Sequence, residues 1–65
     1  MSQLQEVSLF HDEMEALRLK YVENLDQTMA AEKMGISQST FARILYSANK
    51  KLAQGLINGM AIKIE

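Results

Sequence analysis

Apolar side chains recur along this chain of 65 residues at helical spacing, between two short stretches in which apolar and polar residues alternate. Positions three and four apart share one face of an α-helix, so this spacing predicts an amphipathic helix over residues 11–25. Alternation is typical of a half-buried strand and predicts strands over residues 4–9 and 60–64. These two strands are expected to pair either with each other or across a dimer.

Two further helices are predicted between the first helix and the last strand. Asp26 is a suitable N-cap for a helix over residues 27–34, and Gly35 can end that helix in the left-handed conformation. Ser37 can cap a third helix over residues 38–57. The apolar residues on one face of this helix are Phe41, Ile44, Leu45, Ala48, Leu52 and Leu56. We therefore expect one all-α domain over residues 1–65, with three helices, a long third helix and short terminal strands.

The segment AAEKMGISQSTFARIL, residues 30–45, has the features of a helix-turn-helix. Two helices joined by a turn of three or four residues that contains glycine define this motif. Ala31 lies four positions before Gly35, where a small side chain permits a close helix crossing. Phe41 and Ile44 follow the glycine at spacings that let the second helix pack back onto the first. This spacing favours a true helix-turn-helix over a generic helical corner.

The third helix carries polar and small side chains opposite its predicted core face. In a DNA-binding helix-turn-helix, the second helix of the pair enters the major groove with its N-terminal residues at the base edges. Glutamine can bind adenine, arginine can bind guanine or phosphate, and alanine can contact the thymine methyl group. The candidate DNA-binding residues are Gln38, Ser39, Thr40, Ala42, Arg43, Tyr46, Ser47 and Lys50. A solvated helix face has a similar composition, and the grouping of these residues on one face favours the DNA interpretation.

The charge of the chain is small overall and unevenly distributed. The net charge is −1, with seven acidic and three basic residues in the first 34 positions, and one acidic and four basic residues after them. So small a net charge argues against a simple basic nucleic-acid binder. We therefore expect a homodimer, which would double the positive charge that faces DNA. It would also cover a second apolar stripe on the third helix, formed by Tyr46, Ala53 and Ile57.

The composition speaks against several other classes of protein. The chain has no cysteine, so it holds neither a disulfide nor a thiolate metal site, and a cytoplasmic location is expected. His11 and Glu15 have the spacing of a metal pair on a helix, but no third ligand is apparent. We find no nucleophile–base pair, phosphate loop or carboxylate dyad, and therefore expect neither enzyme activity nor a cofactor. No apolar run has the length of a membrane span.

Four segments of the chain carry a resemblance to a known family. They are DEMEALRL at residues 12–19, AAEKMGIS at 30–37, STFARIL at 39–45 and GMAIKIE at 59–65. The chain resembles a small family of uncharacterised bacterial and archaeal helix-turn-helix proteins, whose motif is similar to region four of sigma factors. This resemblance implies a DNA-binding transcriptional regulator whose reading helix begins at Gln38, with Arg43 in the matching position. The chain differs from the family pattern at Phe10, Thr28 and Met29, where a capping threonine and two acidic residues are usual.

The acidic first half of the chain leaves a second interpretation open. A domain similar to sigma region four can dock on RNA polymerase or another regulator without reading bases. The alternative function is therefore a protein-interaction module of the transcription machinery.

Overall fold

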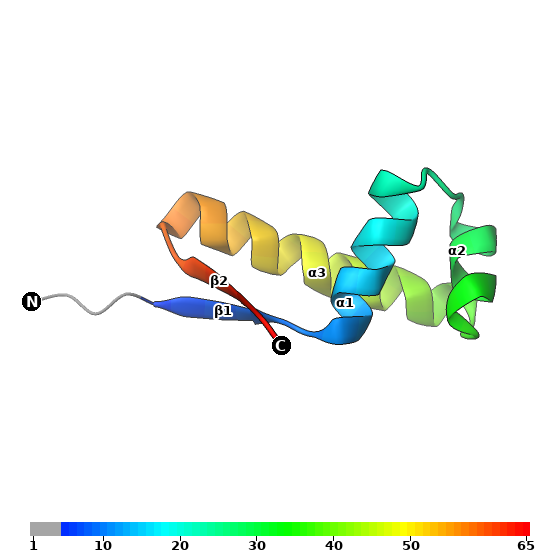
Figure 1. The fold of residues 1–65 in the computed structure, drawn as a ribbon, viewed down its shortest axis with the longest axis horizontal. Coiled ribbons are helices and arrows are strands. Elements are labelled where there is room, and N and C mark those ends of the chain that lie inside the picture. Colours follow the sequence, from blue (N-terminus) through cyan, green and yellow to red (C-terminus); the bar gives the residue numbers. More distant parts are fainter. Residues whose placement is uncertain (1–4) are drawn as a thin grey trace, which may run out of the picture.

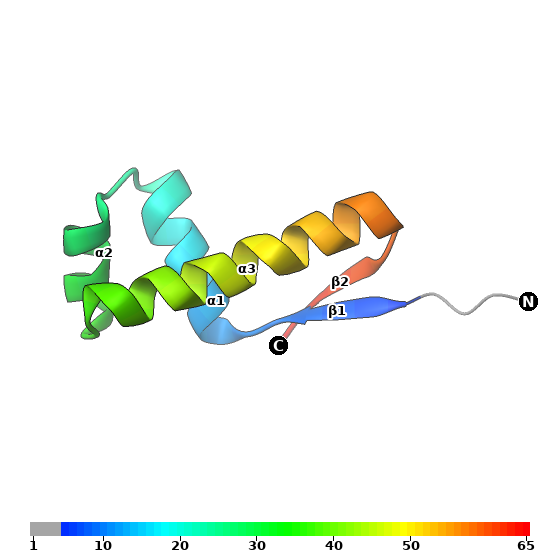
Figure 2. The same cartoon turned by 180° about the vertical axis from the view of Figure 1, so that it is seen from behind.

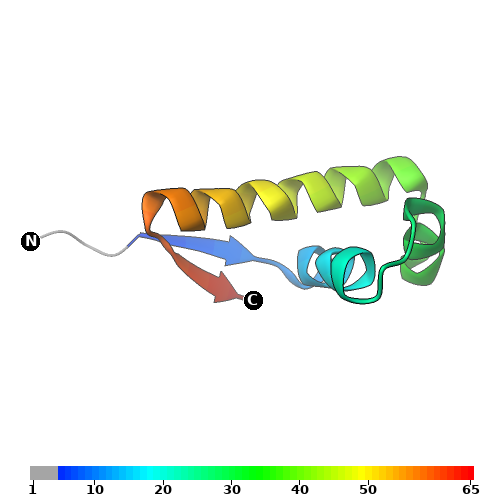
Figure 3. The same ribbon diagram turned by 90° about the horizontal axis from the view of Figure 1, so that it is seen from above.

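The computed structural model describes residues 5–65, which form three α-helices, a π-helical turn and two short strands (Figure 1). In chain order the elements are β1 (Glu6–Leu9), α1 (His11–Leu17), η1 (Arg18–Val22), α2 (Gln27–Met34), α3 (Gln38–Asn58) and β2 (Ala61–Ile64). Helix α2 lies at the N-terminal end of α3, and the two strands run along the C-terminal half of α3 (Figure 2). Seen from above, α3 forms one layer, with α1 and the strands in another (Figure 3). The prediction of three helices between terminal strands is confirmed.

The first helix is shorter than predicted and changes its winding near its end. The sequence predicts one helix over residues 11–25, whereas η1 continues α1 as a π-helix that ends at Val22. The Glu23 N–H donates to the Arg18 carbonyl oxygen at 2.9 Å, five residues back, as in a π-helix. Asn24 then takes a φ of +59°, which asparagine tolerates better than most residues and which turns the chain out of the helix.

The two strands pair with each other in parallel, within one chain. Glu6 is opposite Ala61 and Leu9 is opposite Ile64 in the register of the pair. This confirms the first of the two pairings that the sequence left open. Strand β2 begins at residue 61, one position later than predicted, and Leu4 of the other predicted strand lies outside the described residues.

Phe41 of α3 is the largest fully buried side chain in the core. The buried residues packed around it are Ala16, Leu19, Ala30 and Ala31. The prediction that Leu56 shares the buried face of Phe41 is wrong, because 81% of Leu56 is exposed. At this end of α3 the buried residue is Gly55, where a Cβ atom would lie 2.9 Å from the Ile62 Cγ1 atom. The absence of a side chain therefore lets β2 approach the helix.

Candidate nucleic-acid interface

Helices α2 and α3 are joined by residues 35–37, and each helix begins at a capping side chain. The Asp26 Oδ1 atom accepts from the Met29 N–H at 2.8 Å, and the Ser37 Oγ atom accepts from the Thr40 N–H at 3.1 Å. Each bond satisfies one of the backbone donors that a helix leaves free at its first turn. Gly35 ends α2 with a φ of +69°, as its place in the sequence predicts. The capping predictions at both helices are confirmed.

Small side chains bring α2 close to α3. Ala30 and Ala31 are buried in the same cluster as Phe41, the residue by which α3 packs back onto α2. The Gln27 Nε2 atom donates to the Gln38 carbonyl oxygen at 3.1 Å, across eleven positions of the chain. This bond links the first turn of α2 to the first turn of α3. The two helix N-termini are therefore held together at one end of the molecule.

Most of the predicted DNA-binding residues are exposed on α3. Six of the eight are exposed: Gln38, Ser39, Ala42, Arg43, Tyr46 and Lys50. Thr40 is half-buried, and its hydroxyl accepts from the Ser37 hydroxyl at 2.9 Å. Thr40 is therefore part of the cap of α3.

Ser47 does not point outward with these residues, and its predicted placement opposite the core is wrong. Its hydroxyl donates to the Glu13 Oε2 atom at 2.5 Å, across 34 positions of the chain. Ser47 lies at the edge of the outward face of α3, where the helix meets the start of α1. A helical projection of α3 alone does not show what packs against that edge.

Glu13 is the centre of a buried network that the sequence analysis missed. Besides the bond from Ser47, its Oε1 atom accepts from the Phe10 N–H at 2.8 Å and from the Lys51 Nζ atom at 2.7 Å. The Phe10 side chain, which cannot cap a helix, lies under the Lys51 Nζ atom at 4.0 Å from the ring centroid. A glutamate at the third position of a helix often bonds back to the residue before the helix. That pattern was the one available signal for this network.

Burial and hydrogen bonding act in opposite directions on Glu13. Desolvation by burial raises the pKa of this carboxyl group. Hydrogen bonds from Lys51, the Phe10 backbone and Ser47, together with the charge of Lys51, outweigh that effect and hold the pKa below its ordinary value of 4.5. Glu13 is therefore charged at neutral pH and ties α1 to the middle of α3.

The outward side of α3 carries positive charge only. Helix α3 contains no Asp or Glu, and its basic residues are Arg43, Lys50 and Lys51. The charge of Lys51 is taken up by Glu13, while Arg43 and Lys50 are exposed. The exposed face of α3 can therefore approach a polyanion without a fixed negative charge of its own helix in the way.

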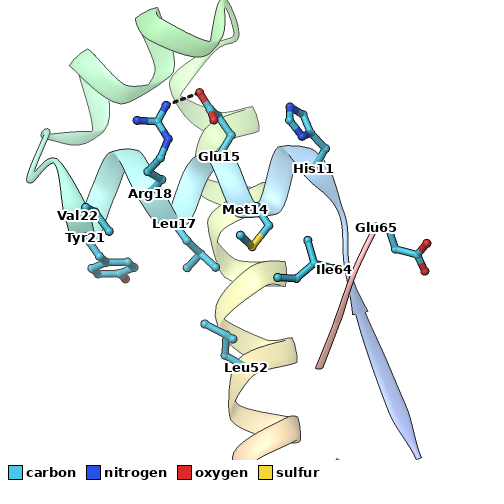
Figure 4. A pocket seen from close by; sticks show the side chains of 10 residues that line it. All are labelled: His11, Met14, Glu15, Leu17, Arg18, Tyr21, Val22, Leu52, Ile64 and Glu65. Atoms are coloured by element: carbon cyan, nitrogen blue, oxygen red, sulfur yellow. Dashed lines mark hydrogen bonds and ion pairs between the residues drawn. The ribbon is translucent and has the colours of Figure 1, made fainter. Parts of the chain in front are cut away.

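A second surface feature is an apolar groove beside α1. This groove of about 620 Å³ separates α1 and η1 from the end of β2 (Figure 4). The residues that line it are His11, Met14, Glu15, Leu17, Arg18, Tyr21, Val22, Leu52, Ile64 and Glu65. The Tyr21 hydroxyl accepts from the Asn49 Nδ2 atom at 3.2 Å, which connects the wall of the groove to α3.

Among residues 5–65, no group of three or more His, Cys, Asp or Glu side chains has the arrangement needed for a metal ion. None of the helices within that range is both long enough and apolar enough to cross a membrane.

Residues 1–65 match the family described as "Protein of unknown function DUF134". The chain belongs to this family. Its UPF0251 relative in Desulforudis audaxviator is 55% identical over 62 residues, which cover 95% of this chain and 40% of the relative. A UPF0251 relative in Thermoanaerobacter pseudethanolicus is 51% identical over all 65 residues, which cover 55% of that protein.

Members of the DUF134 family occur in both bacteria and archaea. A UPF0251 protein of Methanosarcina mazei is 51% identical over 61 residues, which cover 94% of this chain and 37% of the relative. The chain therefore spans about half the length, or less, of the curated relatives described here. No solved structure matches it significantly.

Proposed function

We propose that α2, residues 35–37 and α3 form a helix-turn-helix that binds double-stranded DNA in a sequence-specific manner. The protein would then act as a transcriptional regulator, with the first half of α3 in the major groove. The observation that carries this proposal is the exposed beginning of α3. It projects beside α2 from a turn that Gly35 and Ser37 cap on its two sides, and its helix has no acidic side chain.

The positions of the side chains support distinct roles for them. Gln38 and Ser39 occupy the first turn of α3 and Arg43 the second, where a helix in the major groove meets base edges. Gln38 suits adenine, and Arg43 suits guanine or a phosphate. Tyr46 and Lys50 lie further along the helix and suit the sugar–phosphate backbone.

The N-terminus of α3 supplies a second source of affinity, because its cap, Ser37, is neutral, whereas α2 begins at the carboxylate of Asp26. A helix N-terminus carries partial positive charge and free backbone N–H groups, both of which favour a phosphate. The Gln27–Gln38 hydrogen bond holds the first turns of α2 and α3 side by side. The similarity to sigma region four that the sequence indicates belongs to this same proposal.

Selection from a randomised duplex pool, followed by fluorescence anisotropy on the selected duplex, tests the proposal. Each bound chain that neutralises about three phosphates should give a slope of log affinity against log salt of roughly −3, and a dimer roughly −5. Gln38→Ala and Arg43→Ala should each weaken binding to the selected duplex by about ten- to a hundredfold, at 1–3 kcal/mol per base contact.

Two exposed residues away from the proposed interface provide matched controls. Gln54→Ala makes the same change as Gln38→Ala near the other end of α3, and Lys63→Ala removes one exposed positive charge from β2. Both controls should bind the selected duplex within about threefold of the natural protein, apart from a small electrostatic effect. The absence of binding at low salt, or equal effects at all four positions, would contradict the proposal.

The charge of the first half of the chain favours a second candidate function. The acidic residues Asp12, Glu23 and Glu32 are exposed on this half, and Asp12 lines a hollow together with Arg43 of α3. Such a surface suits docking on RNA polymerase or a regulator that presents basic residues. A pull-down with purified RNA polymerase separates the two functions. Loss of binding on Glu23→Lys but not on Arg43→Ala would favour the docking module.

A further inference from the structure

The core of this domain holds fewer large apolar side chains than its surface. Within residues 5–65, the buried apolar residues larger than alanine are Val7, Leu9, Leu19 and Phe41. The exposed large apolar residues of the same range are Phe10, Met14, Tyr21, Val22, Met29, Tyr46, Leu56, Ile57, Ile62 and Ile64. Small domains with little core commonly gain stability by association. The question is which part of this exposed surface is covered.

The apolar groove beside α1 gathers four of these ten exposed residues. Met14, Tyr21, Val22 and Ile64 project around it (Figure 4). Its charged residues stand at the rim, with Arg18 paired to Glu15. By contrast, the second apolar stripe of α3, formed by Tyr46, Ala53 and Ile57, is interrupted by the charged Lys50. The groove is therefore the more apolar of the two surfaces.

We propose that the apolar groove is the surface by which two copies of this chain associate. Full burial of a large apolar side chain removes about 60–120 Å² of apolar surface from water. The side chains of Met14, Tyr21, Val22 and Ile64 are 37, 55, 77 and 63% exposed. Covering these four in both copies would remove roughly 300–550 Å² of apolar area.

This area places the dimer near the lower size limit of stable interfaces. The smallest stable interfaces bury about 1,200 Å² in total, a little more than half of it apolar. The four exposed side chains supply a large part of that apolar share, and the half-buried Leu17 and Leu52 on the groove lining add to it. An interface near the lower size limit, after the cost of association, gives a dissociation constant on the order of micromolar.

Charge favours a second copy over an arbitrary apolar partner. Arg18 is shared between Glu15 and Glu23, so with Glu65 the rim of the groove has a surplus of negative charge. The positive surplus of the same chain lies in its second half, where Lys50 and Lys63 are exposed. Two copies that pack groove against groove in antiparallel orientation bring the basic second half of each toward the acidic rim of the other.

The groove is remote from the start of α3. Leu52 lies fourteen residues after Gln38, which is about 21 Å along the helix axis. A dimer formed through the groove therefore leaves the first turn of α3 uncovered. The association does not depend on the proposed DNA binding and is measured without DNA.

Sedimentation equilibrium over a range of concentrations tests the dimer with three glutamate substitutions. Val22→Glu and Ile64→Glu place a charge in the groove, whereas Ile57→Glu places one on α3 outside it. All three residues are more than 60% exposed, so none of the substitutions should prevent folding. The natural protein should form a reversible dimer. The two groove variants should raise the dissociation constant by at least about tenfold, and Ile57→Glu should change it by less than about twofold.

Two results would overturn the proposal. The first is a natural protein that stays monomeric at all concentrations. The second is dissociation of the dimer by Ile57→Glu but not by the groove variants, which would assign the interface to the second apolar stripe of α3. Should a groove variant lose its far-UV circular dichroism, dilution of the natural protein under NMR decides. Amide shifts around Val22 and Ile64 should change with concentration, and changes confined to other residues refute the proposal.

Discussion

Replacement of Glu13 by glutamine tests the buried network between α1 and α3. The shape of the side chain is kept, but one carboxylate oxygen becomes an NH2 group, which cannot accept, so either the bond from Ser47 or the bonds from Lys51 and the Phe10 N–H are lost. A hydrogen bond to a charged group contributes about 1.5–3 kcal/mol, and loss of one partner of a buried ion pair costs about 3–5 kcal/mol. The Glu13 and Lys51 side chains are 6 and 20% exposed, so Lys51 can still turn partly to water. We therefore expect a loss of about 2–3 kcal/mol.

Thermal and urea unfolding, followed by far-UV circular dichroism, measures this loss. A chain of this size has a free energy of unfolding of roughly 3–10 kcal/mol, and each kcal/mol shifts the melting temperature by about 4–8 °C. Glu13→Gln should therefore lower the melting temperature by about 10–20 °C. Glu32→Gln makes the same chemical change at an exposed position of α2 and should stay within about 0.5 kcal/mol of the natural protein.

A double-mutant cycle with Lys51→Met separates the pair from its surroundings. If Glu13 and Lys51 stabilise the fold through each other, the two substitutions together should cost less than the sum of the single losses, by at least about 0.5 kcal/mol. Equal stability of Glu13→Gln and Glu32→Gln, or full additivity in the cycle, would refute the network as a source of stability.

Three further predictions follow from the same structure. Because the pKa of Glu13 is lower in the folded chain than its unfolded value of 4.5, its stabilisation is complete above that pH. This stabilisation is lost as the pH falls through the folded pKa. The free energy of unfolding should therefore fall less steeply with decreasing pH in Glu13→Gln than in the natural protein. Gly35→Ala should cost about 1–2 kcal/mol in urea unfolding, because its φ of +69° disfavours a Cβ atom although no atom within 4 Å obstructs one. Gly35→Asn should cost less. Gly55→Val should cost about 1–3 kcal/mol by collision with Ile62, and Ile62→Ala in the same chain should recover part of it; full stability of the single variant would contradict the packing.

Local signals in the sequence were sufficient for much of the fold. Asp26, Gly35 and Ser37 have the side chains that caps and a left-handed turn require, and the structure uses each of them in that way. Helix α2 begins and ends where these residues predict, and α3 is one residue longer than predicted. These elements were predictable because their determinants lie within a few positions of one another.

The remaining features depend on contacts between distant parts of the chain. Glu13 meets Ser47 and Lys51 across 34 and 38 positions, and the local pattern at Glu13 indicates only its bond to the Phe10 N–H. Leu56 has the helical spacing of a core residue, but the neighbouring Gly55 faces β2. The first helix ends at Val22, after the π-helical turn of η1, and not at Leu25 as the sequence predicts. The buried side of the C-terminal half of α3 could not be derived from the sequence, because it depends on where β2 lies against the helix.

Chemical-shift mapping on the ¹⁵N-labelled protein, titrated with the duplex selected by it, tests the proposed DNA interface most directly. The largest amide shifts should fall at the first turns of α2 and α3, around Gln27 and residues 37–43, and should disappear as salt is raised. Shifts confined to α1 and the apolar groove, or the absence of any shift at low salt, would contradict the proposed interface.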